Sequence, residues 1–122
     1  MAGGDQIRVR RVAGEAALVE ISGEQDMSTA PLPTEQFDAL FAEGCVVIAD
    51  IRETTFLDSH VVRVFETATQ RAAERPGVRF ALVVDVEQSR ARRIFDLLRP
   101  LTGDIPSYPS VDAALAALER RE

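Results

Sequence analysis

The spacing of hydrophobic residues divides the chain into strand-like and helix-like segments. Strand-like segments, in which apolar residues alternate with polar ones or form one short run, are 7–12, 16–22, 45–51 and 78–86. Helix-like segments, in which apolar residues recur every three or four positions, are 31–43, 58–75, 89–98 and 110–118. Two strands therefore come first, and helices and strands alternate after them.

The connections between these segments predict which strands are neighbours. Only residues 13–15 separate the first two strands, so these strands are expected to form an antiparallel hairpin. Strands separated by a helix are expected to pair in parallel through right-handed crossovers. We expect loops at 23–26 and 52–57, and at most one short strand within 103–109. The predicted fold is a small α/β structure with a mixed sheet, in the order ββαβαβα(β)α, in which parallel strands follow the N-terminal antiparallel hairpin.

The length of 122 residues fits a single domain, 1–122, with a core over about residues 7–118. Hydrophobic residues make up 46% of the chain, which is enough to build such a core. Residues expected to point into it are Phe37, Ile48, Phe65, Ile94 and Leu115. The lone cysteine, Cys45, begins a strand that is expected to be buried, so we expect an unreactive thiol there.

Composition argues against several classes of function. The net charge of -6, from 20 acidic and 14 basic residues, argues against binding to nucleic acid or to an anionic membrane. All 14 basic residues are arginine, so no lysine is present for Schiff-base chemistry or a phosphate-binding loop. One cysteine and one histidine do not make a zinc site of the usual kind. Without a cofactor motif, a signal peptide or a long apolar run, we expect a cytoplasmic, monomeric or weakly associating domain with no cofactor and no metal.

Several carboxylates are expected near the ends of strands. Residues that would meet at one edge of the sheet are Glu24, Asp26, Asp50 and Asp58. Such a group could hold Mg²⁺, which keeps a small magnesium-dependent enzyme or a phosphotransfer domain as one hypothesis. The alternative is that they form turns and helix caps, and it is preferred because no accompanying acid, base or cation is apparent.

Five short motifs accompany this order of elements: SGEQDM at 22–27, VVIAD at 46–50, TFLDS at 55–59, LTG at 101–103 and AALAAL at 113–118. Together they resemble the STAS domain, the domain of bacterial anti-sigma factor antagonists. The resemblance extends over nearly the whole chain, from about residue 7 to about residue 118. It implies a regulatory binding module with no enzymatic activity. Its partner would be an anti-sigma factor that resembles histidine-kinase ATPase domains.

The chain departs from the family at two positions of the phosphoacceptor motif, which usually reads Asp-Ser-Ser/Thr-Gly-Leu. Residues 58–62 read Asp-Ser-His-Val-Val, so His60 replaces the hydroxyl that a kinase modifies, and Val61 replaces the glycine. Ser59 is the nearest hydroxyl and is retained as a candidate phosphorylation site. The resemblance implies a partner-binding face that contains Asp26, Asp58, Ser59, His60, Val61, Val62 and Arg63.

These residues also have simpler interpretations. Asp58 or Ser59 would cap the helix, and His60 would then be an exposed residue of its first turn. His60 could instead contact a partner, accept a phosphoryl group or respond to pH. A catalytic Ser59–His60 pair is not expected, because adjacent residues on a helix point about 100° apart.

Two binding functions remain open beside the magnesium hypothesis. In the first, the protein is an anti-sigma factor antagonist that occupies the anti-sigma factor and so releases a sigma factor. In the second, it is a scaffold or regulatory STAS subunit that no longer cycles through phosphorylation. The substitutions at His60 and Val61 favour the second.

Overall fold

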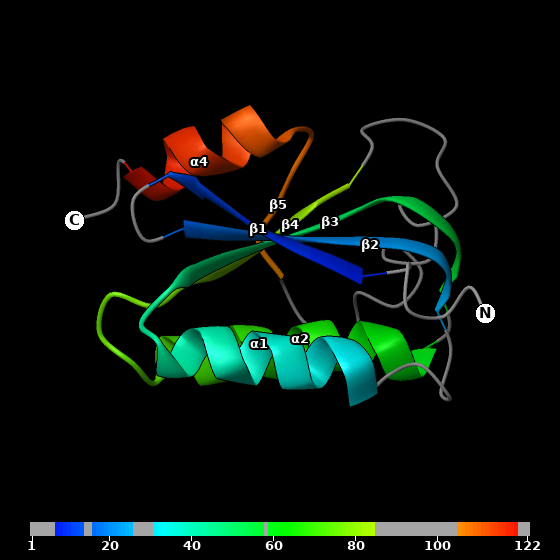
Figure 1. Ribbon diagram of the computed structural model, residues 1–122, viewed down its shortest axis with the longest axis horizontal. Coiled ribbons are helices and arrows are strands. Elements are labelled where there is room, and N and C mark those ends of the chain that lie inside the picture. Colours follow the sequence, from blue (N-terminus) through cyan, green and yellow to red (C-terminus); the bar gives the residue numbers. More distant parts are fainter. Residues whose placement is uncertain (1–6, 14–15, 26–30, 58, 85–104, 120–122) are drawn as a thin grey trace.

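A five-stranded sheet with helices on both faces forms the structure, a computed structural model shown in Figure 1. Residues 7–13, 16–25, 31–57, 59–84 and 105–119 are described. Their elements are β1 (Ile7–Ala13), β2 (Ala16–Gln25), α1 (Pro31–Ala42), β3 (Val46–Leu57), α2 (Ser59–Ala73), β4 (Phe80–Val83), β5 (Ser107–Tyr108) and α4 (Val111–Glu119). Helices α1 and α2 lie together on one face of the sheet, and α4 lies on the other.

Strand order and direction confirm the predicted fold. The sheet order is β1-β2-β3-β4-β5, with β1 and β2 antiparallel and the other pairs parallel. β5 is as short as expected, with only two residues. The predicted helix over 89–98 lies outside the described residues. None of the described helices is long and apolar enough to span a membrane.

The predicted loops at 23–26 and 52–57 are wrong wherever the structure describes them. β2 continues to Gln25 and β3 to Leu57, and the two strands stay paired to their ends, with Ser22 opposite Glu53 and Glu24 opposite Phe56. Two register shifts interrupt this pairing, and Gly23 takes a φ of 76° beside one of them. Backbone pairing needs no apolar side chain, so the hydrophobic pattern gave no sign of this extension.

The core consists of one cluster on each face of the sheet. On the α1–α2 side, Phe37 and Phe65 pack around Phe80, with ring centroids 5.0 Å and 6.3 Å from it. On the α4 side, Leu18, Ile48 and Val83 pack under the helix. Of the expected core residues, Phe37, Ile48 and Phe65 are at most 1% exposed and Leu115 is half-buried against the second cluster, whereas Ile94 is not described.

Arg11 of β1 ties the hairpin to the segment between α1 and β3. Its guanidinium donates hydrogen bonds to Glu43 at 2.6 Å and to the Cys45 sulfur at 2.8 Å. The bond to Glu43 and, after it, the bond to Cys45 raise the pKa of Arg11 above its ordinary value. Cys45 itself is buried, as expected.

The C-terminal end of α1 is closed by a Schellman motif. The Gly44 N–H donates to the Phe41 carbonyl at 2.9 Å, and the Cys45 N–H donates to the Leu40 carbonyl at 3.0 Å. Gly44 has a φ of 85°, a left-handed conformation in which a Cβ atom is disfavoured.

Gly44→Ala is therefore expected to lower the free energy of unfolding by about 1 kcal/mol. No atom lies within 4 Å of the added Cβ, so the loss comes from backbone strain and not from a clash. Urea denaturation would measure it. Gly44→Asn is the matched variant, because asparagine tolerates this conformation, and it should lose clearly less stability. Equal losses for the two variants would contradict the strain explanation.

Candidate functional site

The first turn of α2 contains residues that the motif resemblance assigned to the partner-binding face. The helix begins at Ser59, close after β3 ends at Leu57, and the side chains of Ser59 and His60 are exposed. The first backbone N–H groups of a helix have no partner within it and attract negative charge. Asp26 and Asp58 belong to the expected face but lie outside the described residues. The exposed part of this turn therefore contains Ser59 and His60, and His60 is the residue that the motif resemblance matches to the family's hydroxyl.

Val61 and Val62 also belong to the expected face, but both are completely buried. Val61 packs into the same cluster as Phe65 and Ala68, which follow it at helical spacing. In this conformation neither valine offers surface to a partner. Among the described residues, the expected face is therefore reduced to Ser59, His60 and the exposed Arg63.

A groove of about 250 Å³ runs between α1 and α2, and we name it the α1–α2 groove. It is lined from α1 by Thr34, Phe37 and Asp38, and from α2 by His60, Arg63, Val64, Thr67, Ala68 and Arg71. Phe37, Val64 and Ala68 give it an apolar floor, whereas polar and charged side chains form its rim. Because His60 lines it, the groove is continuous with the exposed first turn of α2.

An ion pair links the two helices along this groove. Nη1 of Arg71 donates to both carboxylate oxygens of Asp38 at 2.9 Å. The expected partner-binding face included Arg63, but the sequence did not single out Arg71, Asp38 or the groove. Arg63, Thr67 and Arg71 follow one another at four-residue spacing, which was the only available signal.

Comparison with known proteins identifies the family. The STAS domain profile matches residues 7–114, most of the chain. The protein belongs to the STAS domain family. The resemblance inferred from the sequence motifs is therefore confirmed.

Solved structures agree with this assignment. An anti-sigma factor antagonist from Mycobacterium paratuberculosis is 26% identical, with a TM-score of 0.78 over 94% of this chain and 96% of that one. The anti-sigma factor antagonist SpoIIAA in its unphosphorylated form is 15% identical, with a TM-score of 0.67 over 94% and 99%. The Bacillus cell fate determinant SpoIIAA in its phosphorylated form is 14% identical, with a TM-score of 0.62 over 92% and 98%. No curated protein matches this STAS domain in sequence.

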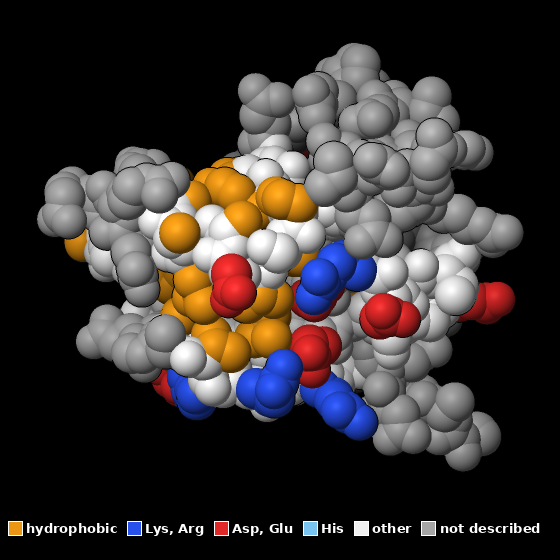
Figure 2. All heavy atoms as spheres, turned by 90° about the horizontal axis from the view of Figure 1, so that it is seen from above, with side chains coloured by type: hydrophobic (Ala, Val, Ile, Leu, Met, Phe, Trp, Pro, Cys, Tyr) orange, Lys and Arg blue, Asp and Glu red, His pale blue; other side chains and the backbone are white. Residues whose placement is uncertain are grey.

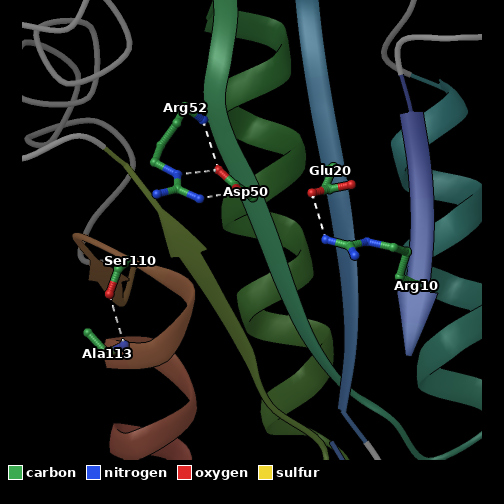
Figure 3. Close-up of polar contacts among 6 residues, drawn as sticks. All are labelled: Arg10, Glu20, Asp50, Arg52, Ser110 and Ala113. Carbon is green, nitrogen blue, oxygen red and sulfur yellow. Dashed lines mark hydrogen bonds and ion pairs between the residues drawn. The ribbon is translucent and has the colours of Figure 1, made fainter. Parts of the chain in front are cut away.

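On the opposite side of the sheet, this STAS domain carries a row of charged residues across β1, β2 and β3 (Figure 3). Asp50, only 7% exposed, accepts hydrogen bonds from the Arg52 backbone N–H, Nε and Nη2 at 3.1, 3.0 and 2.8 Å. Glu20, the register partner of Asp50, accepts from Arg10 at 3.1 Å. The α4 side of the molecule, seen in Figure 2, shows one area of hydrophobic side chains beside an area where acidic and basic ones alternate.

The expected meeting of Glu24 and Asp50 at one edge of the sheet is wrong. β3 continues past Asp50 to Leu57, and Glu24 lies four residues beyond Glu20 along β2, about 13 Å away at strand spacing. Asp50 is also occupied by Arg52. Across the described ranges, no three His, Cys, Asp or Glu residues are grouped so that they could hold a metal ion. The described residues therefore give the magnesium hypothesis no site.

Proposed function

We propose that this STAS domain is a regulatory binding protein of the anti-sigma factor antagonist type. It binds an anti-sigma factor in the cytoplasm and so frees a sigma factor to act in transcription. The observation that carries the proposal is the likeness to the Mycobacterium paratuberculosis antagonist, at 26% identity over nearly the full length of both chains.

Binding is proposed to use the exposed first turn of α2. Ser59, His60 and Arg63 supply the described part of this face, and Asp26 and Asp58 complete it by family resemblance. The buried Val61 and Val62 hold the turn against the core instead of touching the partner. No bond is made or broken by this chain, so release of the sigma factor is an exchange of binding partners.

The absence of a hydroxyl at residue 60 favours a form of this function that is not switched at the usual site. A phosphate on this turn would add about two negative charges and would repel an acidic partner. Since His60 cannot be modified by a Ser/Thr kinase, binding is proposed to be constitutive or to be controlled elsewhere. A scaffold or regulatory STAS subunit that has left the phosphorylation cycle is the second candidate, and the same substitution favours it.

The binding experiment uses the purified chain and each anti-sigma factor of the histidine-kinase ATPase type encoded in the same genome. Isothermal titration calorimetry is expected to find at least one complex with a Kd at or below about 1 µM. His60→Asp places a negative charge on the turn and should weaken that complex about tenfold or more. Gln70→Asp places the same charge on an exposed position of α2 away from the turn, and should have little effect.

Two results would count against the antagonist function. One is the absence of binding to every anti-sigma factor tested, which would favour the scaffold. The other is a complex that forms but fails to displace the sigma factor in a competition assay.

A further inference from the structure

We infer that the α1–α2 groove receives an apolar side chain, flanked by carboxylates, from a short amphipathic helix of the anti-sigma factor. The inference rests on the proposed function, because it names what the partner inserts beside the first turn of α2. It adds the residues of a second contact region, on α1 and further along α2, that the acceptor motif does not include.

The size and chemistry of the groove fit a protein side chain. Its floor is built from Phe37, Val64 and Ala68, and Val64 is only partly buried. A volume of about 250 Å³ is below the about 300–1,000 Å³ of typical small-molecule pockets. Covering this floor removes apolar surface from water, which is the main source of affinity for a helix docked in a groove.

The charge of the rim fits a partner with acidic residues. Two arginines, Arg63 and Arg71, line the groove from α2, against a single acid, Asp38, from α1. The Asp38 carboxylate already accepts from Arg71 through both of its oxygens. Arg63 is exposed and has no hydrogen bond or ion pair with any other described residue. In a chain with a net charge of -6, this rim is a local cationic site that a partner carboxylate can occupy.

The position of the groove favours the same partner that covers the first turn of α2. His60 belongs to both, and Arg63, Thr67 and Arg71 then follow along the helix. From residue 60 to residue 71 the helix rises about 16 Å at 1.5 Å per residue, which matches about three turns of a docked helix. A protein that contacts Ser59 and His60 therefore has the groove within reach of the same binding surface.

The experiment measures the affinity of the anti-sigma factor for two groove variants and their matched controls. Arg63→Glu reverses the rim charge, and Arg8→Glu makes the same change in net charge at an exposed position of β1. Thr67→Trp fills the groove, and Ala73→Trp places the same side chain at an exposed position of α2 that does not line the groove. Urea midpoints check that all four variants remain folded.

We expect Arg63→Glu and Thr67→Trp each to raise the Kd about tenfold or more, and both controls to stay within about threefold of the unaltered chain. Arg63→Glu should also flatten the dependence of affinity on salt, because the lost contact is between charges. Arg63→Lys should keep most of the affinity and the salt dependence.

The possible failures are distinguishable. If the unaltered chain binds but both groove variants match their controls, the groove inference is wrong and Arg63 is also removed from the proposed binding face. The proposed binding of an anti-sigma factor still stands. If only Thr67→Trp weakens binding, the groove is occupied but the carboxylate part of the inference is overturned. If the unaltered chain binds no anti-sigma factor, the proposed function fails and this inference fails with it.

Discussion

Phe65→Ala is expected to lower the free energy of unfolding by about 3–5 kcal/mol. Phe65 is completely buried in the middle of α2, and its ring lies with centroids 6.3 Å from those of both Phe37 and Phe80. Removing it leaves a cavity at the junction of α1, α2 and β4, where three elements have to move together to close the space.

Urea denaturation followed by far-UV circular dichroism would measure this loss, since the chain has no tryptophan to serve as a fluorescence probe. A domain of this size has a total stability of about 5–15 kcal/mol, so the variant should unfold at a much lower urea concentration. Val9→Ala on β1 is the control, because Val9 is 38% exposed, and it should lose less than about 1 kcal/mol. A loss below about 1 kcal/mol for Phe65→Ala would mean that α2 does not pack on the sheet as described.

The second large effect concerns phosphorylation. Incubated with ATP and an anti-sigma factor that has kinase activity, the unaltered protein is expected to remain largely unmodified. The motif resemblance matches His60 to the acceptor position, and Ser59 is rotated from His60 by about 100° around the helix. We therefore expect the Ser59 hydroxyl to be poorly aimed at a kinase that modifies the next residue. Phosphopeptide mapping would measure the modified fraction.

His60→Ser should restore phosphate acceptance if the kinase-binding surface is otherwise intact. The double variant Ser59→Ala with His60→Ser should still be phosphorylated, which would identify residue 60 as the acceptor. Efficient modification of Ser59 in the unaltered chain would contradict this account. If the unaltered chain and His60→Ser both stay unmodified, the surface that the kinase contacts has diverged beyond this position.

The second departure from the family motif is Val61 in place of glycine, and the structure changes how it should be tested. Val61 is fully buried, so Val61→Gly would remove core packing and place glycine within a helix, at a cost of about 3 kcal/mol. A double variant with His60→Ser would therefore report lost stability as well as restored chemistry. His60→Ser alone is the cleaner experiment, and the double variant needs a stability measurement beside it.

The sequence by itself determined the order of the elements and most of the core. Phe37, Ile48 and Phe65 were predicted to be in the interior, and all three are buried. This prediction was possible because the spacing of apolar residues is a local property that shows within one helical turn or one strand. The motifs at 22–27 and 55–59 identified the STAS family for a similar reason, since each is a contiguous stretch of chain. They also led to the prediction that residue 60 takes the acceptor position, which phosphopeptide mapping would test.

Tertiary structure decided the features that depend on distant segments. The extension of β2 to Gln25 and β3 to Leu57 follows from backbone pairing between strands far apart in sequence, which leaves no hydrophobic signature. Burial of Val62 depends on how α2 is rotated against the sheet. The hydrogen bond from Arg52 to the Asp50 carboxylate depends on β3 continuing through Arg52. The α1–α2 groove exists only because two helices lie side by side, so residues more than twenty positions apart share one surface. The periodicity of apolar residues specifies which face of a helix or strand is apolar. It does not specify which other helix or strand packs on that face, or how far along the element the contact extends.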